Sequence, residues 1–286
     1  MSFSSDIKEY LLSLREKRDC CMRSLLYGIY VGCGEDTGSE IVFSMTSEKC
    51  AHMLCETIAT IFPVFPAVSG RRTVAAGAQE HDCLVDELGI TDGLNLSVCK
   101  CEACPEAFIR GLYIGCARIT DPSKGYHLEL AVRERYFEAV RSLLGATLRE
   151  PKVITRRSEK ALYYKSSATA EEFLTYIGAG KYALWLMEEK IIKDMHNEAN
   201  RKANCEIANL DKAATAAAAQ LAAVKKLQKS CMLKELPPVL YETAMLRLEF
   251  EELSLEELRM KFDPPISKSG LSHRFERIIA LADKSQ

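Results

Sequence analysis

The sequence predicts an α+β fold in which two similar halves, each with helices packed on a small antiparallel sheet, precede an all-helical carboxyl-terminal part. Residues 28–34 read GIYVGCG and residues 111–117 read GLYIGCA, and the segments around the two copies follow in the same order. Such repetition at a fixed spacing is the mark of a duplicated architecture. Beyond residue 187 the chain consists of helix-forming segments.

The chain has 286 residues, enough for two or three compact units, with 48% hydrophobic and 27% charged residues. It has no apolar run of about 18 residues, so no membrane span is predicted. The opening MSFSSDIKEYLLSLREK lacks the apolar core of a signal peptide, and we expect a cytoplasmic protein. A net charge of −2 means that any binding to nucleic acid must depend on local basic patches.

Residues 1–19 are expected to form an amino-terminal helical segment, and residues 20–186 the duplicated domain, with halves at about 20–92 and 99–180. In each half a helix with the repeated seven residues comes first. A strand-like run follows (SEIVFSM, then YHLELAV), and next a helix with apolar residues at three- and four-residue spacing (SEKCAHMLCETIATIF, then ERYFEAVRSLLGATL). An extended segment and a short helix close each half.

The small residues of the two repeated helices predict a seam between the halves. Gly28 and Gly32 lie four positions apart and so share one helical face, as do Gly111 and Gly115. Two helices with such faces can approach more closely than the usual separation of about 8–10 Å. Tight packing in separate cores is the alternative, but the recurrence with matched flanks favours a seam.

The chain has twelve cysteines, which we interpret mainly as small buried thiols, because disulfide frameworks are typical of small secreted proteins. Cys101 and Cys104 have the spacing of zinc ligands, and a full site would need either Cys83 or the pair Cys20 and Cys21. Cys99 lies in the same stretch, VCKCEACPE. Because only one such CxxC pair is present, the sequence predicts no metal and no cofactor, and a zinc site is the alternative.

Residues 187–230 are predicted to be a basic helical connector. Between residues 190 and 229 there are eight Lys and Arg against four Asp and Glu, and AATAAAAQLAAVKKLQK consists almost entirely of strong helix formers. We therefore expect one or two helices in this segment rather than a flexible tether.

Residues 231–286 are predicted to form a three-helix module. Pro237 and Pro238 suit the first turn of a helix that runs to about Phe250. Ser254 and Glu257 form a capping-box signature for a second helix. A third helix begins near Ser267 or Ser269, with an inner apolar stripe of Leu271, Phe275, Ile278 and Ala282.

The opposite face of this third helix carries polar and basic side chains that suit a DNA major groove. Arginine can donate two hydrogen bonds to guanine, and serine can bind a base or a phosphate. Residues near the amino end of a recognition helix usually contact the bases. The predicted contacts are Ser267, Lys268, Ser269, Ser272, His273, Arg274 and Arg277. A protein-binding three-helix module would show the same apolar stripes, and the module contains eight basic and ten acidic residues.

The whole chain resembles the WhiA family of bacterial regulators linked to sporulation and cell division. The resemblance depends on SFSSDIKEYL, the pair Cys20 and Cys21, RGLYIG followed by TDPSKGYHLE, NRKANCEIANLDK and PPISKSGLSHRFERI, in this order. It implies a degenerate domain like that of LAGLIDADG homing endonucleases, with two αββαββα halves about a pseudo-twofold axis. It also implies a carboxyl-terminal helix-turn-helix that binds DNA without cutting it.

Cleavage looks lost because the acids that hold the nuclease metals are absent. The matching positions are occupied by Val31, Cys33, Ile114 and Cys116, none of which offers the hard oxygen ligand that Mg²⁺ prefers. We therefore predict no enzymatic activity. In the nucleases the sheets form a saddle on DNA, so basic residues there are predicted as a secondary contact: Arg71, Arg72, Arg156, Arg157, Lys160 and Lys165. A solvated sheet face is the alternative.

Taken with the resemblance, these observations favour a nucleoid-associated, sequence-specific transcriptional regulator involved in sporulation or in cell division and chromosome segregation. Its expected partners are double-stranded DNA and a second transcription regulator or division protein, with no membrane and no small-molecule substrate. The alternative is a nucleoid or division scaffold that does not read sequence. A metal-dependent DNA endonuclease is the least favoured hypothesis.

Overall fold

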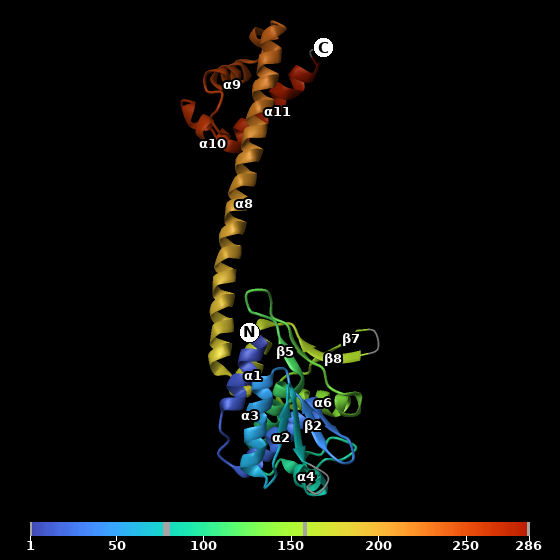
Figure 1. The fold of residues 1–286 in the computed structure, drawn as a ribbon. Coiled ribbons are helices and arrows are strands. Elements are labelled where there is room, and N and C mark those ends of the chain that lie inside the picture. The colour runs from blue at the N-terminus through green and yellow to red at the C-terminus, as the bar shows by residue number, and fades with distance from the viewer. Residues whose placement is uncertain (1, 77–80, 157–158, 285–286) are drawn as a thin grey trace. The chain divides into compact units, whose positions relative to one another are not determined.

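The computed structural model describes residues 2–76, 81–156 and 159–284 (Figure 1). The chain divides into two compact units, Met1–Lys193 and Asp194–Gln286. The division lies inside the segment that the sequence assigned to the connector. No helix in the described ranges combines the length and apolar character that crossing a membrane requires.

The first unit contains two halves with the same order of elements. The amino-terminal helix α1 (Phe3–Ser13) precedes the first half, which consists of α2 (Asp19–Cys33), β1 (Gly34–Asp36), β2 (Ile41–Ser44), α3 (Glu48–Ile61), β3 (Ala67–Ser69), β4 (Arg72–Ala76) and α4 (His81–Leu88). After the short turn η1 (Leu96–Val98), the second half consists of α5 (Cys104–Cys116), β5 (Ala117–Ile119), β6 (Leu128–Leu130), α6 (Glu134–Thr147), β7 (Lys152–Arg156), β8 (Glu159–Tyr164) and α7 (Ser167–Tyr176).

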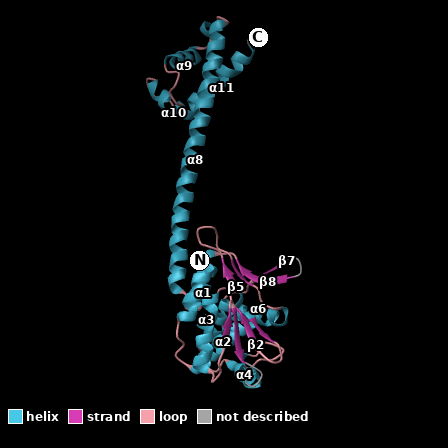
Figure 2. Cartoon of the chain, viewed as in Figure 1, coloured by secondary structure: helices cyan, strands magenta, loops and turns pink. Residues whose placement is uncertain are grey.

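Each half has a four-stranded antiparallel sheet, with strand order β1-β2-β4-β3 in the first and β5-β6-β8-β7 in the second. Figure 2 shows that the strands of the described chain all belong to the first unit. The duplicated α+β fold predicted from the sequence is therefore confirmed. The resemblance implies the strands β1 and β5, which follow the two repeated helices directly, but the residue pattern does not reveal them, because a three-residue run shows no alternation of polar and apolar residues.

The helices α2 and α5 form the centre of the first unit. Tyr27 and Tyr30 of α2 and Phe108 and Tyr113 of α5 are fully buried, and α1, α3, α6 and α7 surround the pair with further apolar side chains. Burying an aromatic side chain of this size contributes about 1.5–3 kcal/mol. A helix that is apolar on nearly every side is typical of the core of a domain rather than of its surface.

The glycines of α2 and α5 lie where the two backbones meet. A Cβ atom added to Gly28 would lie 2.1 Å from the carbonyl oxygen of Phe108, and one added to Gly111 would lie 2.0 Å from that of Leu25. A Cβ at Gly32 would lie 2.9 Å from the Cα of Gly115. These separations leave no room for any side chain, so the helices can pack this closely only with glycine at these positions.

The helix α8 (Gly180–Lys229) contributes to the cores of both units. Near its start, Ala183 and Leu186 are buried in the first core, and near its end, Val224 and Leu227 are buried in the second. The rest of the second unit consists of η2 (Met232–Glu235), α9 (Pro238–Glu249), α10 (Leu255–Leu258), η3 (Arg259–Lys261) and α11 (Lys268–Lys284). The capping box of Ser254 and Glu257 is present, although the α-helix that it opens is only one turn long.

Candidate nucleic-acid interface

The helix α11 has one face fixed in the core of the second unit. Its first turn is capped by Ser267, whose hydroxyl accepts a hydrogen bond from the backbone amide of Gly270 at 3.1 Å. The apolar stripe predicted from the sequence is buried against α9, α10 and the end of α8: Leu271, Phe275, Ile278 and Ala282. The orientation of α11 about its own axis is therefore determined by packing.

The opposite face of α11 presents most of the predicted DNA contacts to solvent. The exposed residues are Ser267, Lys268, Ser269, His273 and Arg277, while Ser272 and Arg274 are half-buried. Arg274 differs from the rest because its guanidinium donates to the Thr243 hydroxyl at 3.4 Å and lies 5.3 Å from the ring centroid of Phe262. Arg274 thus helps to hold α11 on α9, in addition to lying beside the outward face.

A fully buried arginine that the sequence analysis did not single out holds this module together. The Arg247 guanidinium donates to the Leu253 carbonyl at 2.6 Å and to the side-chain oxygen of Gln220 at 2.8 Å, and lies 5.3 Å from the ring centroid of Phe275. It therefore links α8, α9, the loop before α10, and α11. Arg247 follows the buried Ala244 by three positions, and residues three apart share one face of a helix, so this spacing could have predicted that Arg247 lies on the inner face of α9.

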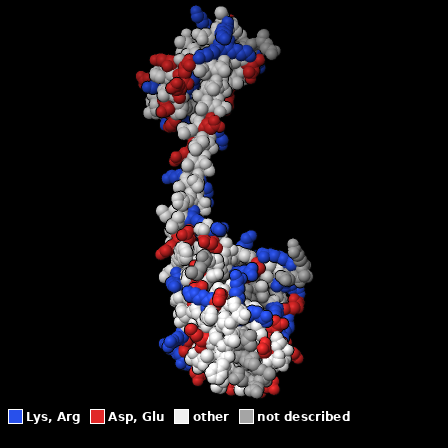
Figure 3. Space-filling view, viewed as in Figure 1, with Lys and Arg blue, Asp and Glu red and all other residues white. Residues whose placement is uncertain are grey.

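Charge is unevenly distributed over the second unit. Acidic side chains gather over α9 and α10 (Figure 3), from the group Glu249, Glu251, Glu252, Glu256 and Glu257. The segment 264–286, by contrast, holds four basic and two acidic residues. A polyanion is therefore attracted more strongly to α11 than to the α9–α10 side of the module.

The basic residues near the two sheets differ in whether they are paired with a carboxylate. Arg156 lies 3.0 Å from the Glu129 carboxylate, and Lys160 lies 2.8 Å from the Glu134 carboxylate. Strand register places Lys160 on the same face of β8 as the buried Leu162, toward the helices. Arg71, Arg72 and Lys165 are exposed, and Arg157 lies outside the described residues.

The family resemblance places the metal site of the nucleases at the carboxyl-terminal ends of α2 and α5. Val31 and Ile114 are buried, and burial raises the pKa of Cys33 to about 11 and that of Cys116 to about 12. Both thiols are therefore protonated at neutral pH. A protonated thiol is a poor metal ligand, because the thiolate is the form that binds metal.

Two cationic side chains lie beside these thiols. Lys8 of α1 is 2% exposed, close enough to Cys33 and Cys116 to interact electrostatically, and burial lowers its pKa. The Arg133 guanidinium donates to the carbonyl of Val31 at 3.2 Å, at the carboxyl end of α2. A divalent cation here would meet two positive groups, whereas a nuclease supplies carboxylates.

The amino-terminal ends of the same two helices carry a group of cysteines. The Sγ atoms of Cys20, Cys21, Cys101 and Cys104 all lie within 4.8 Å of one another, the only group of possible metal ligands found among the described residues. Cys99 is not a member of this group and its Sγ accepts a hydrogen bond from Ser24 at 3.9 Å, while Cys83 is exposed on α4. The structure therefore brings Cys101 and Cys104 together with Cys20 and Cys21, which is one of the two ligand sets that the sequence offered for a zinc site.

Comparisons with known proteins match both units. Residues 105–196 match the description of a WhiA LAGLIDADG-like domain, and residues 199–282 match that of a WhiA C-terminal HTH domain. The solved structure of full-length WhiA from Thermatoga maritima aligns with 99% of each chain at a TM-score of 0.59 and 24% identity, which shows a shared fold.

Curated relatives are named as probable cell division proteins WhiA. The one from Clostridium botulinum is 36% identical over 189 residues, so that the aligned region covers 66% of this chain and 60% of that protein. The one from Heliobacterium modesticaldum is 31% identical over 308 residues, covering 99% of this chain and 96% of that protein. With a relative of this similarity matched along almost its whole length, and with a LAGLIDADG-like domain followed by a helix-turn-helix domain, this chain belongs to the WhiA family.

Proposed function

We propose that the protein is a non-enzymatic, nucleoid-associated transcriptional regulator that reads a DNA sequence with α11 and acts in cell division, chromosome segregation or sporulation. The observation that carries the proposal is the two-sided character of α11. Its apolar stripe is buried, while Lys268, His273 and Arg277 are exposed on the opposite face. A helix held in this way can enter the major groove with its polar side chains directed at the bases.

The exposed residues of α11 suit different parts of the duplex. Lys268 and the backbone amides of the first turn would bind phosphates, because a helix amino terminus attracts anions. Arg277 can donate two hydrogen bonds to guanine, and His273 lies on the same outward face one turn earlier. Arg274 supports the proposal indirectly, since its contact with Thr243 keeps α11 in register with α9.

The direct test is DNA binding by α11 variants. A preferred site would first be selected from a random DNA library with the full-length chain. Arg277→Ala is expected to weaken binding to that site by about 1–3 kcal/mol and to relax the base preference at one position. Lys268→Ala is expected to weaken binding equally for all sequences. Lys284→Ala, at the far end of the same helix, is the matched control, and an equal loss in that variant would contradict the proposal.

A secondary contact through the sheets is a separate part of the proposal. Arg71 and Arg72 are exposed, whereas Arg156 is paired with Glu129, so the first pair is expected to contribute more to phosphate binding. Each phosphate contact removed should reduce the slope of log affinity against log salt by about 0.9. Arg71→Gln with Arg72→Gln is therefore compared with Arg156→Gln, and an unchanged slope in both would confine DNA binding to the second unit.

The proposal that cleavage is absent is supported by the protonated thiols and the buried Lys8 at the carboxyl ends of α2 and α5. Two-metal nucleases use oxygen ligands to hold the ions at the attacking and leaving oxygens. Supercoiled plasmid incubated with the purified chain and Mg²⁺ or Mn²⁺ is expected to remain intact. Nicking above the level of a mock purification would reverse this conclusion.

A scaffold role is the second candidate, and one observation favours it. The middle of α8 exposes large apolar side chains, with Met195, Ile207 and Leu210 each more than 60% exposed. Such residues are typical of protein-binding surfaces when they lie close together. Chromatin profiling separates the two candidates, because a sequence-reading regulator gives sharp sites and a scaffold gives a diffuse profile.

A further inference from the structure

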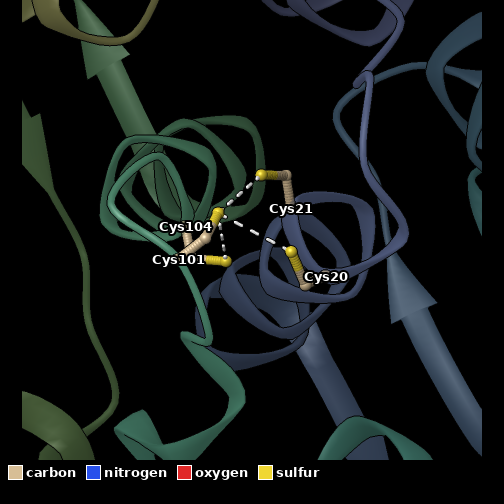
Figure 4. A group of neighbouring side chains, drawn as sticks. All are labelled: Cys20, Cys21, Cys101 and Cys104. Carbon is tan, nitrogen blue, oxygen red and sulfur yellow. Dashed lines mark hydrogen bonds between the residues drawn. The ribbon is translucent and has the colours of Figure 1, made fainter.

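We propose that Cys20, Cys21, Cys101 and Cys104 form a binding site for a single zinc ion, which joins the amino-terminal ends of α2 and α5. Figure 4 shows the four side chains converging from the first turn of α2 and from the segment that enters α5. The site shares no residue with the surfaces proposed to bind DNA. It also lies at the opposite end of the helix pair from the lost nuclease site.

The distances between the sulfur atoms fit one tetrahedral ion. The Sγ of Cys101 lies 3.6 Å from that of Cys20, 3.5 Å from that of Cys21 and 3.5 Å from that of Cys104. Zinc–sulfur bonds of about 2.3 Å in a regular tetrahedron place neighbouring sulfurs about 3.8 Å apart. A cubane iron–sulfur cluster holds its four cysteine sulfurs farther apart than this. These distances also exceed the disulfide bond of about 2.05 Å, so the four groups are thiols.

Positive groups lie beside these four thiols. Cys104 is the first residue of α5, and Cys20 and Cys21 lie in the first turn of α2, so these three cysteines lie at helix amino termini. The positive end of a helix dipole stabilises a thiolate, which is the form that binds zinc. The Arg18 side chain also contacts Cys101. This arginine offsets part of the negative charge of a zinc ion bound by four thiolates.

Burial indicates a structural ion rather than a catalytic one. Cys21 and Cys104 are buried, and Cys20 and Cys101 are partly exposed. Cys20 borders a cavity of about 630 Å³, which provides a route for the ion to enter. Four protein ligands fill the tetrahedral positions of zinc, so no position is left for water or substrate. The ion would therefore act as a cross-link between residues 80 positions apart in the sequence.

The symmetry of the chain gives independent support. The repeat spacing of 83 residues that relates Gly28 to Gly111 also relates Cys21 to Cys104, so each half contributes an equivalent cysteine at the same helical position. The other two ligands, Cys20 and Cys101, flank this symmetric pair. The same spacing also relates Cys33 to Cys116, so what distinguishes the amino-terminal ends is that four thiols converge there.

The first experiment measures zinc in the full-length chain purified under reducing conditions. Elemental mass spectrometry is expected to find about one zinc per chain, as a single four-cysteine site requires. Cys20→Ser and Cys101→Ser are expected to lose most of this zinc, and both positions are partly exposed, so the fold should tolerate the change. Cys99→Ser, next to the site but outside the ligand set, is expected to retain it. Equal zinc contents in Cys99→Ser and Cys101→Ser would overturn the proposal.

The second experiment does not depend on how well a variant folds. Wild-type chain is stripped of metal with a chelator, titrated with Co²⁺ under reducing conditions, and followed by absorption. The expected result is the intense thiolate-to-cobalt charge transfer and the visible bands of tetrahedral cobalt, saturating at one ion and displaced by zinc. A cobalt spectrum without sulfur charge transfer, or an iron–sulfur spectrum in the purified chain, would reject the zinc site.

Discussion

The two ends of the α2–α5 pair carry the same kind of side chain in different surroundings. At the amino-terminal end, four cysteines converge within 4.8 Å where two helix dipoles are positive. At the carboxyl-terminal end, Cys33 and Cys116 are buried as protonated thiols beside Lys8 and Arg133. The presence of cysteine therefore does not by itself indicate metal binding.

The packing of the helix pair does not depend on the side chains at its two ends. The close approach of the helices depends on the glycines in the middle of the pair, which are independent of the residues at either end. Substitution of the residues at one end is therefore expected to leave this packing intact. The chemistry of each end can therefore change separately.

The largest expected effect comes from the glycines that hold both ends in place. Gly111→Ala would put a methyl group 2.0 Å from the carbonyl oxygen of Leu25, so the helices must separate. We expect the free energy of unfolding to fall by roughly 3–5 kcal/mol, as measured by urea denaturation. Gly180→Ala, where no atom lies within 4 Å, is the control and should change it little. Similar values for both variants would mean that the seam is looser than the structure shows.

A smaller effect of the opposite sign is expected at the carboxyl-terminal end. Lys8→Met removes a buried ammonium while keeping a side chain of similar length, and should stabilise the protein by about 1–2 kcal/mol at neutral pH. Burial lowers the pKa of Lys8 below its usual 10.5, so the folded state binds this proton less tightly than the unfolded chain does. The advantage of the variant should therefore shrink as the pH rises toward 10.5. Destabilisation by Lys8→Met would show instead that the ammonium is well paired.

The smallest expected effect is a difference between Cys101 and Cys33 in the pH at which they react, which is measured without a change in stability. The Arg18 side chain lowers the pKa of Cys101 to about 6, whereas burial raises that of Cys33 to about 11. Because the thiolate is the reactive form, alkylation of the zinc-stripped chain should reach half its maximal rate near pH 6 at Cys101. Cys33 should stay unmodified until strongly alkaline pH, as peptide mass spectrometry would show. Arg18→Gln should move the Cys101 profile to higher pH, and coincident profiles for the two thiols would refute the contrast between the two ends.

The parts of the molecule that sequence reasoning predicted well are those with a local signal. The stripe from Leu271 to Ala282 follows helical periodicity, and the structure buries all four of its members. The order of helices and strands in both halves follows from the repeated flanks of the two glycine motifs. In these cases short sequence patterns are enough to predict the secondary structure.

The features that were missed depend on contacts between distant residues. Lys8 and Arg247 are charged, and a charged residue in an amphipathic pattern normally lies at the surface, yet both are buried by neighbours that only the tertiary structure supplies. The grouping of Cys20 and Cys21 with Cys101 and Cys104 was one of two alternatives in the sequence. The 83-residue repeat, applied to Cys21, would have favoured the correct one.

The contacts of Arg247 have a consequence for how this protein can be cut into working fragments. A fragment that started at residue 231, the boundary expected from the sequence, would lack Gln220, Val224 and Leu227. Its buried guanidinium would lose the amide oxygen that it donates to, and the hydrophobic surface of α9 and α11 would be left open to water. An autonomous fragment of the second unit must therefore include the last three turns of α8, so the end of this helix is an integral part of the helix-turn-helix domain.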